Sequence, residues 1–223
     1  MQFNINRHMV FDDPKFKCWK RRIEANGNIL KNIEVLATIS RDQNNLLVAF
    51  LDCRLLTPEG IEIPRYIAIR GESVVIVPMF TCPENKEIYT LMVKQHRIGD
   101  GDYNIEFPAG STNSMEDDLK VIALRELQEE LHINVSPEEL RPLASGPISI
   151  NSGLSDDRVY FFYFERKVPL AFLKEMDGRK TGCPEDYEYI CIKLLKMSEV
   201  SNILNSSALI GVKLLERALN RVF

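Results

Sequence analysis

The sequence lacks the features that mark several common classes of protein. It has no excess of basic charge, because 28 lysine and arginine residues stand against 32 aspartate and glutamate residues, giving a net charge of -4. Nucleic-acid-binding domains present basic patches, so we expect no nucleic-acid partner. No apolar run approaches the roughly 20 residues of a membrane-spanning helix, and the N-terminal stretch contains no apolar signal-peptide core. We therefore expect no membrane partner.

Cysteine is also scarce. The sequence has five cysteines, at positions 18, 53, 82, 183 and 191, with no C-x-x-C pair among them. An odd and scattered set differs from the dense, paired cysteines of a disulfide scaffold. Cys183 has no Cys-His-Asn context, and the three histidines show no zinc-ligand spacing. We expect a reducing compartment, the cytoplasm.

The chain is long enough for one large domain or for a domain with a smaller appendage. Its 223 residues are 45% hydrophobic, which suffices for a sizeable core. Residues 32–70 read as strands separated by turns and predict a small antiparallel sheet. We therefore assign an N-terminal sheet domain to residues 1–70. Strands and helices alternate over residues 71–223, which favours a mixed sheet covered by helices.

Several elements are predicted within the larger part. Residues 73–80 and 88–97 form a hairpin, and the aromatic-rich residues 158–166 form a buried strand rather than a base-stacking surface. Residues 167–175 are ambiguous. The remaining predictions are a strand over residues 187–195 and an amphipathic closing helix over residues 206–222, with serine as its N-cap.

A further helix is predicted over residues 119–131, with the sequence LKVIALRELQEEL. Ser114 and Asp117 resemble a capping box at its start. Within this helix, Glu126, Glu129 and Glu130 fall in an arc of about 100°, apart from the leucines that face the core. Like charges at such spacings repel by a few tenths of a kcal/mol. Either the acidic face is solvated, which is the commoner case, or a positive group lies over it.

The residues that precede this helix favour the second alternative, in which a positive group lies over the acidic face. The run EFPAG, an acidic loop and then RELQEELHI resemble the Nudix box, G-x5-E-x7-R-E-U-x-E-E-x-G-U, in which U is a bulky aliphatic residue. The positions that match the pattern are Gly110, Arg125, Glu126, Leu127, Glu129, Glu130 and Ile133.

Two positions depart from the pattern. Counting back from Arg125 places Asp117 at the first acidic position, whereas Glu116 keeps the spacing from Gly110. His132 stands where the family has its second glycine, at a helix end that favours left-handed backbone. Histidine adopts that conformation more readily than most side chains.

The resemblance extends to the Nudix subfamily that hydrolyses ADP-ribose and related nucleoside diphosphate sugars. It covers about residues 72–219. The run VKQHR ends at Arg97, which matches the arginine that contacts the substrate in that subfamily. The run EFPAG contains Ala109, which matches the alanine whose carbonyl binds the metal. NSGLSDD resembles the turn S-P-G-x-x-D-E, with Ser152 for proline and Asp157 for glutamate. TGCPEDYEYICIKLL resembles the acidic loop and strand that supply a further glutamate.

The resemblance implies a fold, a metal and a set of site residues. The fold is an α/β/α sandwich with a mixed sheet, preceded by a small antiparallel sheet, in a homodimer. Mg²⁺, with Mn²⁺ as the alternative, suits oxygen ligands. The implied ligands are the Ala109 carbonyl, Glu126, Glu129 and Glu130, and the implied substrate-binding residues are Arg97, Glu106 and Gly110.

Catalytic roles follow from the same resemblance. Arg125 would hold a carboxylate through a bidentate pair. The base for the attacking water is Glu129 or an acid of the later loop, where Glu185, Asp186 and Glu188 are candidates. The sequence leaves these alternatives open.

The implied reaction is Mg²⁺-dependent hydrolysis of the pyrophosphate bond of ADP-ribose or a related nucleoside diphosphate sugar, giving a nucleoside monophosphate and a sugar phosphate. Two alternatives remain. The substrate could be UDP-glucose or another nucleotide sugar. The chain could also be a catalytically weak nucleotide-binding module, since shortening one acid displaces a ligand and misplacement of about 1 Å can cost about a hundredfold in rate.

Overall fold

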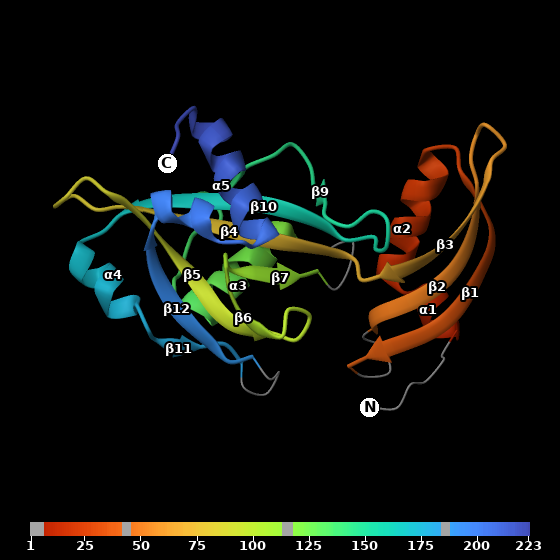
Figure 1. The fold of residues 1–223 in the computed structure, drawn as a ribbon, viewed down its shortest axis with the longest axis horizontal. Coiled ribbons are helices and arrows are strands. Elements are labelled where there is room, and N and C mark those ends of the chain that lie inside the picture. Colours follow the sequence, from red (N-terminus) through yellow and green to blue (C-terminus); the bar gives the residue numbers. More distant parts are fainter. Residues whose placement is uncertain (1–6, 42–45, 113–117, 184–187) are drawn as a thin grey trace. The chain divides into compact units, whose positions relative to one another are not determined.

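A computed structural model describes residues 7–41, 46–112, 118–183 and 188–223 (Figure 1). The chain divides into two compact units. The N-terminal unit comprises residues 1–73, 111–117 and 148–159, and the larger unit comprises residues 74–110, 118–147 and 160–223. Two short later segments of the chain thus belong to the N-terminal unit.

The N-terminal unit contains the predicted small sheet. Its strands β1 (Ile29–Ser40), β2 (Leu46–Leu56) and β3 (Glu62–Ile69) are antiparallel and lie in the order β1-β2-β3. Two helices that the sequence did not predict precede them, α1 (Arg7–Asp12) and α2 (Pro14–Ala25). The description of residues 1–70 as a sheet domain was therefore incomplete.

Helix α2 has clear local causes. Asp13 is its N-cap, with a side chain that accepts a hydrogen bond from the Lys15 amide at 2.8 Å, and Pro14 occupies the first turn. Its buried Phe16 and Trp19 pack with β-strand residues such as Leu51 in one hydrophobic cluster. Charged residues interrupt this stretch, so its apolar face is hard to recognise in the sequence.

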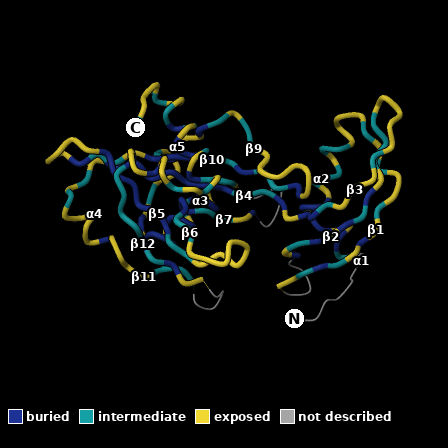
Figure 2. Tube along the Cα trace, in the orientation of Figure 1, coloured by how far each residue is buried: buried dark blue, intermediate teal, exposed yellow. Residues whose placement is uncertain are grey.

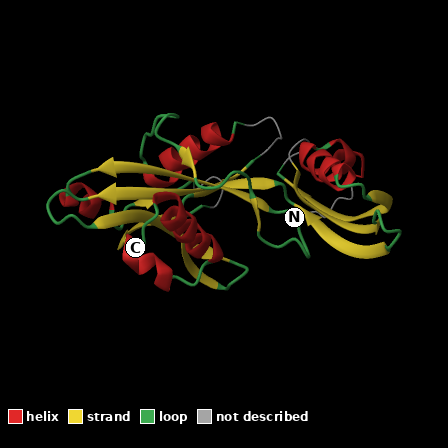
Figure 3. Ribbon diagram, turned by 90° about the horizontal axis from the view of Figure 1, so that it is seen from above, coloured by secondary structure: helices red, strands yellow, loops and turns green. Residues whose placement is uncertain are grey.

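The larger unit is built on a mixed sheet with helices on both faces, as Figure 3 shows, which confirms the predicted α/β/α sandwich. The main order of the described strands is β11-β12-β5-β4-β10-β8, and β6, β7 and β9 pair with β5, β4 and β10. The strands of this sheet are β4 (Glu72–Thr81), β5 (Ile88–Arg97), β6 (Asp102–Glu106), β7 (Ala109–Ser111), β8 (Arg141–Pro142), β9 (Ile148–Ser149), β10 (Arg158–Lys167), β11 (Lys180–Thr181) and β12 (Ile190–Lys196). Strand β9 and the first two residues of β10, with which it pairs, fall in the N-terminal unit.

The helical elements of this unit are α3 (Leu119–Leu131), α4 (Leu170–Met176), the 3-10 helix η2 (Met197–Asn202) and α5 (Ser206–Leu219). Leu127 of α3 belongs to the main core, together with Val93 of β5 and Phe164 of β10. On α5, a Cβ at Gly211 would come within 2.9 Å of the Phe107 ring, so helix and sheet pack closely there. In the part of the chain that the structure describes, no helix is long and apolar enough to cross a membrane.

Most of the predicted elements of this unit are confirmed. The hairpin is formed by β4 and β5, and β10 is the buried aromatic strand, with β4 and β5 among the most buried segments in Figure 2. The ambiguous stretch contains helix α4. The serine cap predicted for α5 is wrong, because Asn205 is the N-cap and its side chain accepts from the Ala208 amide at 3.0 Å.

Helix α3 carries the acidic residues and has well-defined ends. Its N-cap is Asp118, which accepts from the Lys120 amide at 2.9 Å; Ser114 and Asp117, the predicted capping box, lie outside the described residues. At the other end His132 is left-handed, with φ 54°. The His132 amide donates to the Gln128 carbonyl at 3.1 Å, which is the bond of an αL cap, and the Ile133 amide donates to the Leu127 carbonyl at 3.1 Å. His132 therefore occupies the conformation that glycine was expected to provide.

We expect His132→Gly to stabilise the protein by about 0.5–1 kcal/mol, because glycine adopts left-handed backbone without the Cβ penalty. His132→Ala is the matched control. It keeps the penalty and loses the 3.1 Å contact between Nδ1 and the Gln128 carbonyl, so it should be less stable than the parent protein. Urea unfolding measures both changes, and a glycine variant weaker than the parent would contradict the expectation.

Candidate active site

The three acids of α3 occupy different environments. Glu126 and Glu130 are buried, at 8% and 3% exposed, whereas the Glu129 side chain is 49% exposed. The three acids therefore do not share one exposed face. Strand β7 contacts the two buried acids, which the helical arc alone could not reveal.

Strand β7 fits closely against the two buried acids. A Cβ at Gly110 would lie 2.1 Å from Glu126 Oε1 and 2.4 Å from its Cγ, so only glycine leaves room for this side chain. The Ala109 amide donates to Glu130 Oε2 at 3.1 Å. The backbone of Ala109 and Gly110 thus holds both carboxylates in place.

Burial of these carboxylates changes their proton affinity. Burial raises the pKa of Glu130 well above its usual value, and the neighbouring Glu126 raises it further, while the Ala109 amide and Arg97 oppose the change. Burial also raises the pKa of Glu126, against the hydrogen bond from Arg125. A cation bound at this place would oppose both shifts, because a nearby positive charge favours the ionised carboxylate.

Two arginines contact the acids. Arg97 forms a bidentate pair with Glu106, with distances of 2.9 Å from Nε and 2.8 Å from Nη2. Arg125 donates to Glu126 Oε1 at 2.7 Å and lies 4.0 Å from Glu129, so among the described residues it contacts two carboxylates. The Arg97 side chain is 45% exposed.

Of the three candidate acids in the loop before β12, the structure describes Glu188. Glu188 adds to the repulsion that raises the pKa of Glu126 and of Glu130, and its charge also acts on Arg97. The structure therefore brings Glu188 into the electrostatic range of the α3 acids. Glu185 and Asp186, the other loop candidates, lie outside the described residues, as does Glu116.

The donor set suits a hard divalent cation in its chemistry. Glu126, Glu130 and the Ala109 backbone gather at one place, and Mg²⁺ keeps several waters, so it needs few protein oxygens. Within the described ranges, no three histidine, cysteine or acidic side chains already form a metal-binding group. The two buried acids and the Ala109 backbone are therefore the residues that fit such a cation, and the exposed Glu129 lies 4.0 Å from Arg125.

Some contacts near the site had no signal in the sequence. The Thr181 hydroxyl of β11 donates to the Glu130 carbonyl at 2.6 Å, although the two residues are far apart in the chain.

The turn at residues 151–157 belongs to the N-terminal unit, where Asp156 Oδ1 accepts from the Arg70 and Gly71 amides. The same unit contains a cavity of about 700 Å³. Its lining includes Trp19, Arg65 and Tyr66.

Comparison with known proteins agrees with this geometry. The family model for the NUDIX domain matches residues 71–200. Nudix hydrolase 14, chloroplastic, of Arabidopsis thaliana is 23% identical over 224 residues, which cover 94% of this chain and 72% of that protein. A crystal structure of an ADP compounds hydrolase is similar in fold, with a TM-score of 0.61 and 15% identity, covering 86% of this chain and 94% of that one.

We expect Gly110→Ala to destabilise the protein by about 1–3 kcal/mol, because the new Cβ overlaps Glu126 and forces it to move. In a Glu126→Ala background the obstacle is absent, and the same change should cost less than about 0.5 kcal/mol. Gly146→Ala is the control, since open space surrounds that position. Urea unfolding measures the three effects, and equal losses from Gly110→Ala in both backgrounds would disprove the contact.

Proposed function

Because the chain belongs to the Nudix family of hydrolases, we propose that it hydrolyses the pyrophosphate bond of ADP-ribose or a related nucleoside diphosphate sugar. The products would be a nucleoside monophosphate and a sugar phosphate. The observation that carries this proposal is the pair of buried carboxylates, Glu126 and Glu130, held against Ala109 and Gly110 beside the Arg97–Glu106 pair.

The residues present divide the work of such a reaction. Glu126, Glu130 and the Ala109 carbonyl would hold Mg²⁺ or Mn²⁺, joined by Glu129. When bound, the cation supplies neutralisation of phosphate charge and activation of water. Arg97, oriented by Glu106, offers guanidinium donors to the diphosphate. Arg125 keeps Glu126 and Glu129 on the same side of α3.

A general base must take a proton from the attacking water. Glu129 is exposed on α3 and Glu188 lies within the field of the buried acids, so both remain candidates among the described residues. Glu185 and Asp186 complete the set proposed from the sequence. Comparing pH profiles of kcat for the individual Gln variants would identify the base, because only its replacement removes the acidic limb.

The N-terminal unit supports two further proposals, one on substrate binding and one on dimerisation. Its cavity, with Trp19, Arg65 and Tyr66 in the lining, offers ring surfaces and a cation that suit part of a nucleotide substrate. Phe50 and Tyr66 are exposed on the β1-β2-β3 sheet, which supports a homodimer formed through this unit.

We also propose a cytoplasmic location, in keeping with five free cysteines.

We expect Glu130→Gln to lower kcat for ADP-ribose by about a hundredfold or more, because the charge that binds the cation is lost. Its melting temperature should not fall, since an amide is less costly to bury than a carboxylate. Glu129→Gln should also reduce turnover, whereas the exposed Glu138→Gln serves as a control. AMP release and thermal unfolding are the measurements, and unchanged turnover in both site variants would defeat these roles.

A substrate panel tests the specificity. With Mg²⁺ present, ADP-ribose should be converted to AMP and ribose 5-phosphate, and EDTA should stop the reaction. A higher kcat/KM for UDP-glucose, with UMP as product, would favour the alternative nucleotide-sugar substrate. Calorimetric binding of ADP-ribose without AMP release would instead favour a catalytically weak binding module.

A further inference from the structure

The C-terminal carbonyls of α3 are bound by a different part of the chain. The Thr181 hydroxyl donates to the Glu130 carbonyl at 2.6 Å, and the Gly182 amide donates to the Glu129 carbonyl at 3.4 Å. The last carbonyls of a helix have no partner within the helix. Here the partners are consecutive residues at the end of β11, and they bind the backbone of two acids of the site.

Gly182 also lies directly against the backbone of Glu188. Gly182 is left-handed, with φ +89°, and a Cβ there would lie 2.7 Å from the Glu188 carbonyl. The Glu188 amide in turn donates to the Cys183 carbonyl at 3.0 Å. The backbone of Glu188 is therefore packed directly against the residue that binds Glu129.

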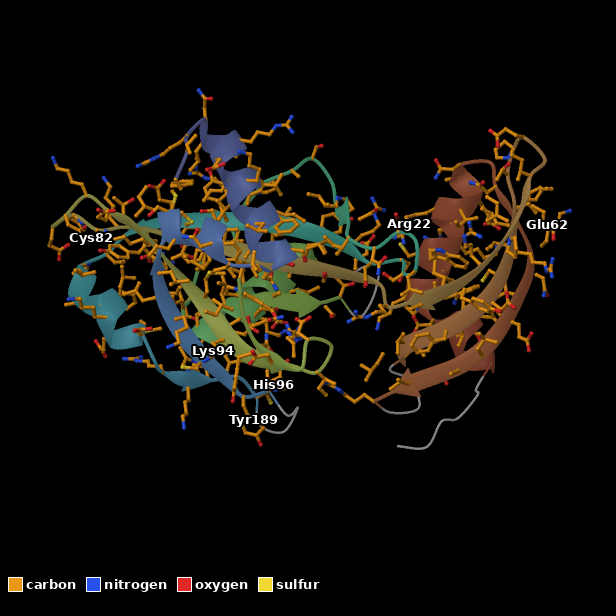
Figure 4. The ribbon with its side chains drawn as sticks, viewed as in Figure 1. Arg22, Glu62, Cys82, Lys94, His96 and Tyr189 are labelled. Carbon is orange, nitrogen blue, oxygen red and sulfur yellow. The ribbon has the colours of Figure 1, made fainter. Side chains whose placement is uncertain are left out.

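The strands on either side continue this connection to the substrate arginine. Thr181 of β11 pairs with Ile190 of β12, and Cys191 of β12 pairs with Lys94 of β5, the strand that ends at Arg97. Figure 4 shows Tyr189 near the start of β12, close to Lys94 and His96 at the end of β5. A small displacement of β11 would thus move Glu188 relative to the acids of α3.

Building on the proposed function, we infer that Thr181 and Gly182 are positioning residues that set the distance between Glu188 and the buried acids of α3. Their two hydrogen bonds and the close contact of Gly182 with Glu188 carry this inference. The electrostatic effect of Glu188 on Glu126, Glu130 and Arg97 agrees with it. Thr181 does not touch substrate; it acts through Glu130 and Glu188.

A purely structural role for Thr181 predicts something different. As a simple cap of α3 it would contribute to stability, and its loss would lower activity equally whether or not Glu188 carries a charge. As a positioning residue it would affect turnover and cation affinity only while the Glu188 carboxylate is present. The two roles are therefore separated by a double-mutant cycle.

The experiment uses the full chain and compares Thr181→Val, which removes the hydroxyl at nearly constant shape, with Thr181→Ser, which keeps it. Each change is made in the parent and in the Glu188→Gln background. We expect Thr181→Val to lower kcat for ADP-ribose about tenfold with KM nearly unchanged, and Thr181→Ser to restore it. In the Glu188→Gln background, Thr181→Val should change kcat by less than about twofold.

Glycine variants give a matched second test. Gly182 and Gly178 are both left-handed, so alanine at either position meets the same backbone penalty. Only Gly182→Ala meets the Glu188 carbonyl, because open space surrounds Gly178. Gly182→Ala should therefore lower kcat at least about tenfold more than Gly178→Ala, and it should also lower the melting temperature more, because its new Cβ overlaps backbone. Both variants are assayed well below their melting temperatures.

Titration with Mn²⁺ separates failure of this inference from failure of the proposed function. Thr181→Val should weaken Mn²⁺ binding several-fold, and this effect should vanish in the Glu188→Gln background, whether or not the parent hydrolyses ADP-ribose. An inactive parent that shows this pattern would contradict only the proposed function. Equal effects of Thr181→Val in both backgrounds, or a change confined to melting temperature, would overturn the positioning role.

Discussion

Two carboxylates placed side by side in a buried position are the constraint on which the rest of this structure depends. Burial raises the pKa of Glu126 and of Glu130, and the charge of Glu126 raises the pKa of Glu130 further. Such a pair is unfavourable for a fold unless it has a task that needs concentrated negative charge. Binding a divalent cation against a diphosphate, as proposed for this chain, is such a task.

The surrounding elements can be understood as ways of holding that pair. Strand β7 contributes a residue without a side chain and one amide donor, while Arg97 and Arg125 reduce the repulsion from either side. The C-terminal end of α3 is capped by the left-handed His132, and the Thr181 hydroxyl of β11 binds one of its last carbonyls. The helix is therefore fixed at the end where its acids lie, so the proposed cation would need little reorganisation of the backbone.

How far the sequence predicts this arrangement depends on whether the relevant residues lie in one continuous stretch. Gly110 and His132 sit at fixed spacings from the acids, so their places in the family pattern could be read directly. Helix α2 could not, because charged residues interrupt its apolar face. The burial of Glu130 and its bond with Thr181 also escaped prediction, since both depend on strands that approach α3 from distant parts of the chain.

The N-terminal unit is assembled from segments that lie far apart in the chain, and this has a consequence for synthesis on the ribosome. The Ala68 amide donates to the Leu154 carbonyl, and Asp156 accepts from the Arg70 and Gly71 amides, so the edge of β3 is completed by residues translated much later. The nascent chain must therefore carry an unfinished sheet edge while most of the next strands and helix α3 emerge. The residues at the end of β3 therefore reach their final contacts only after Leu154 and Asp156 have been translated, more than 80 residues later.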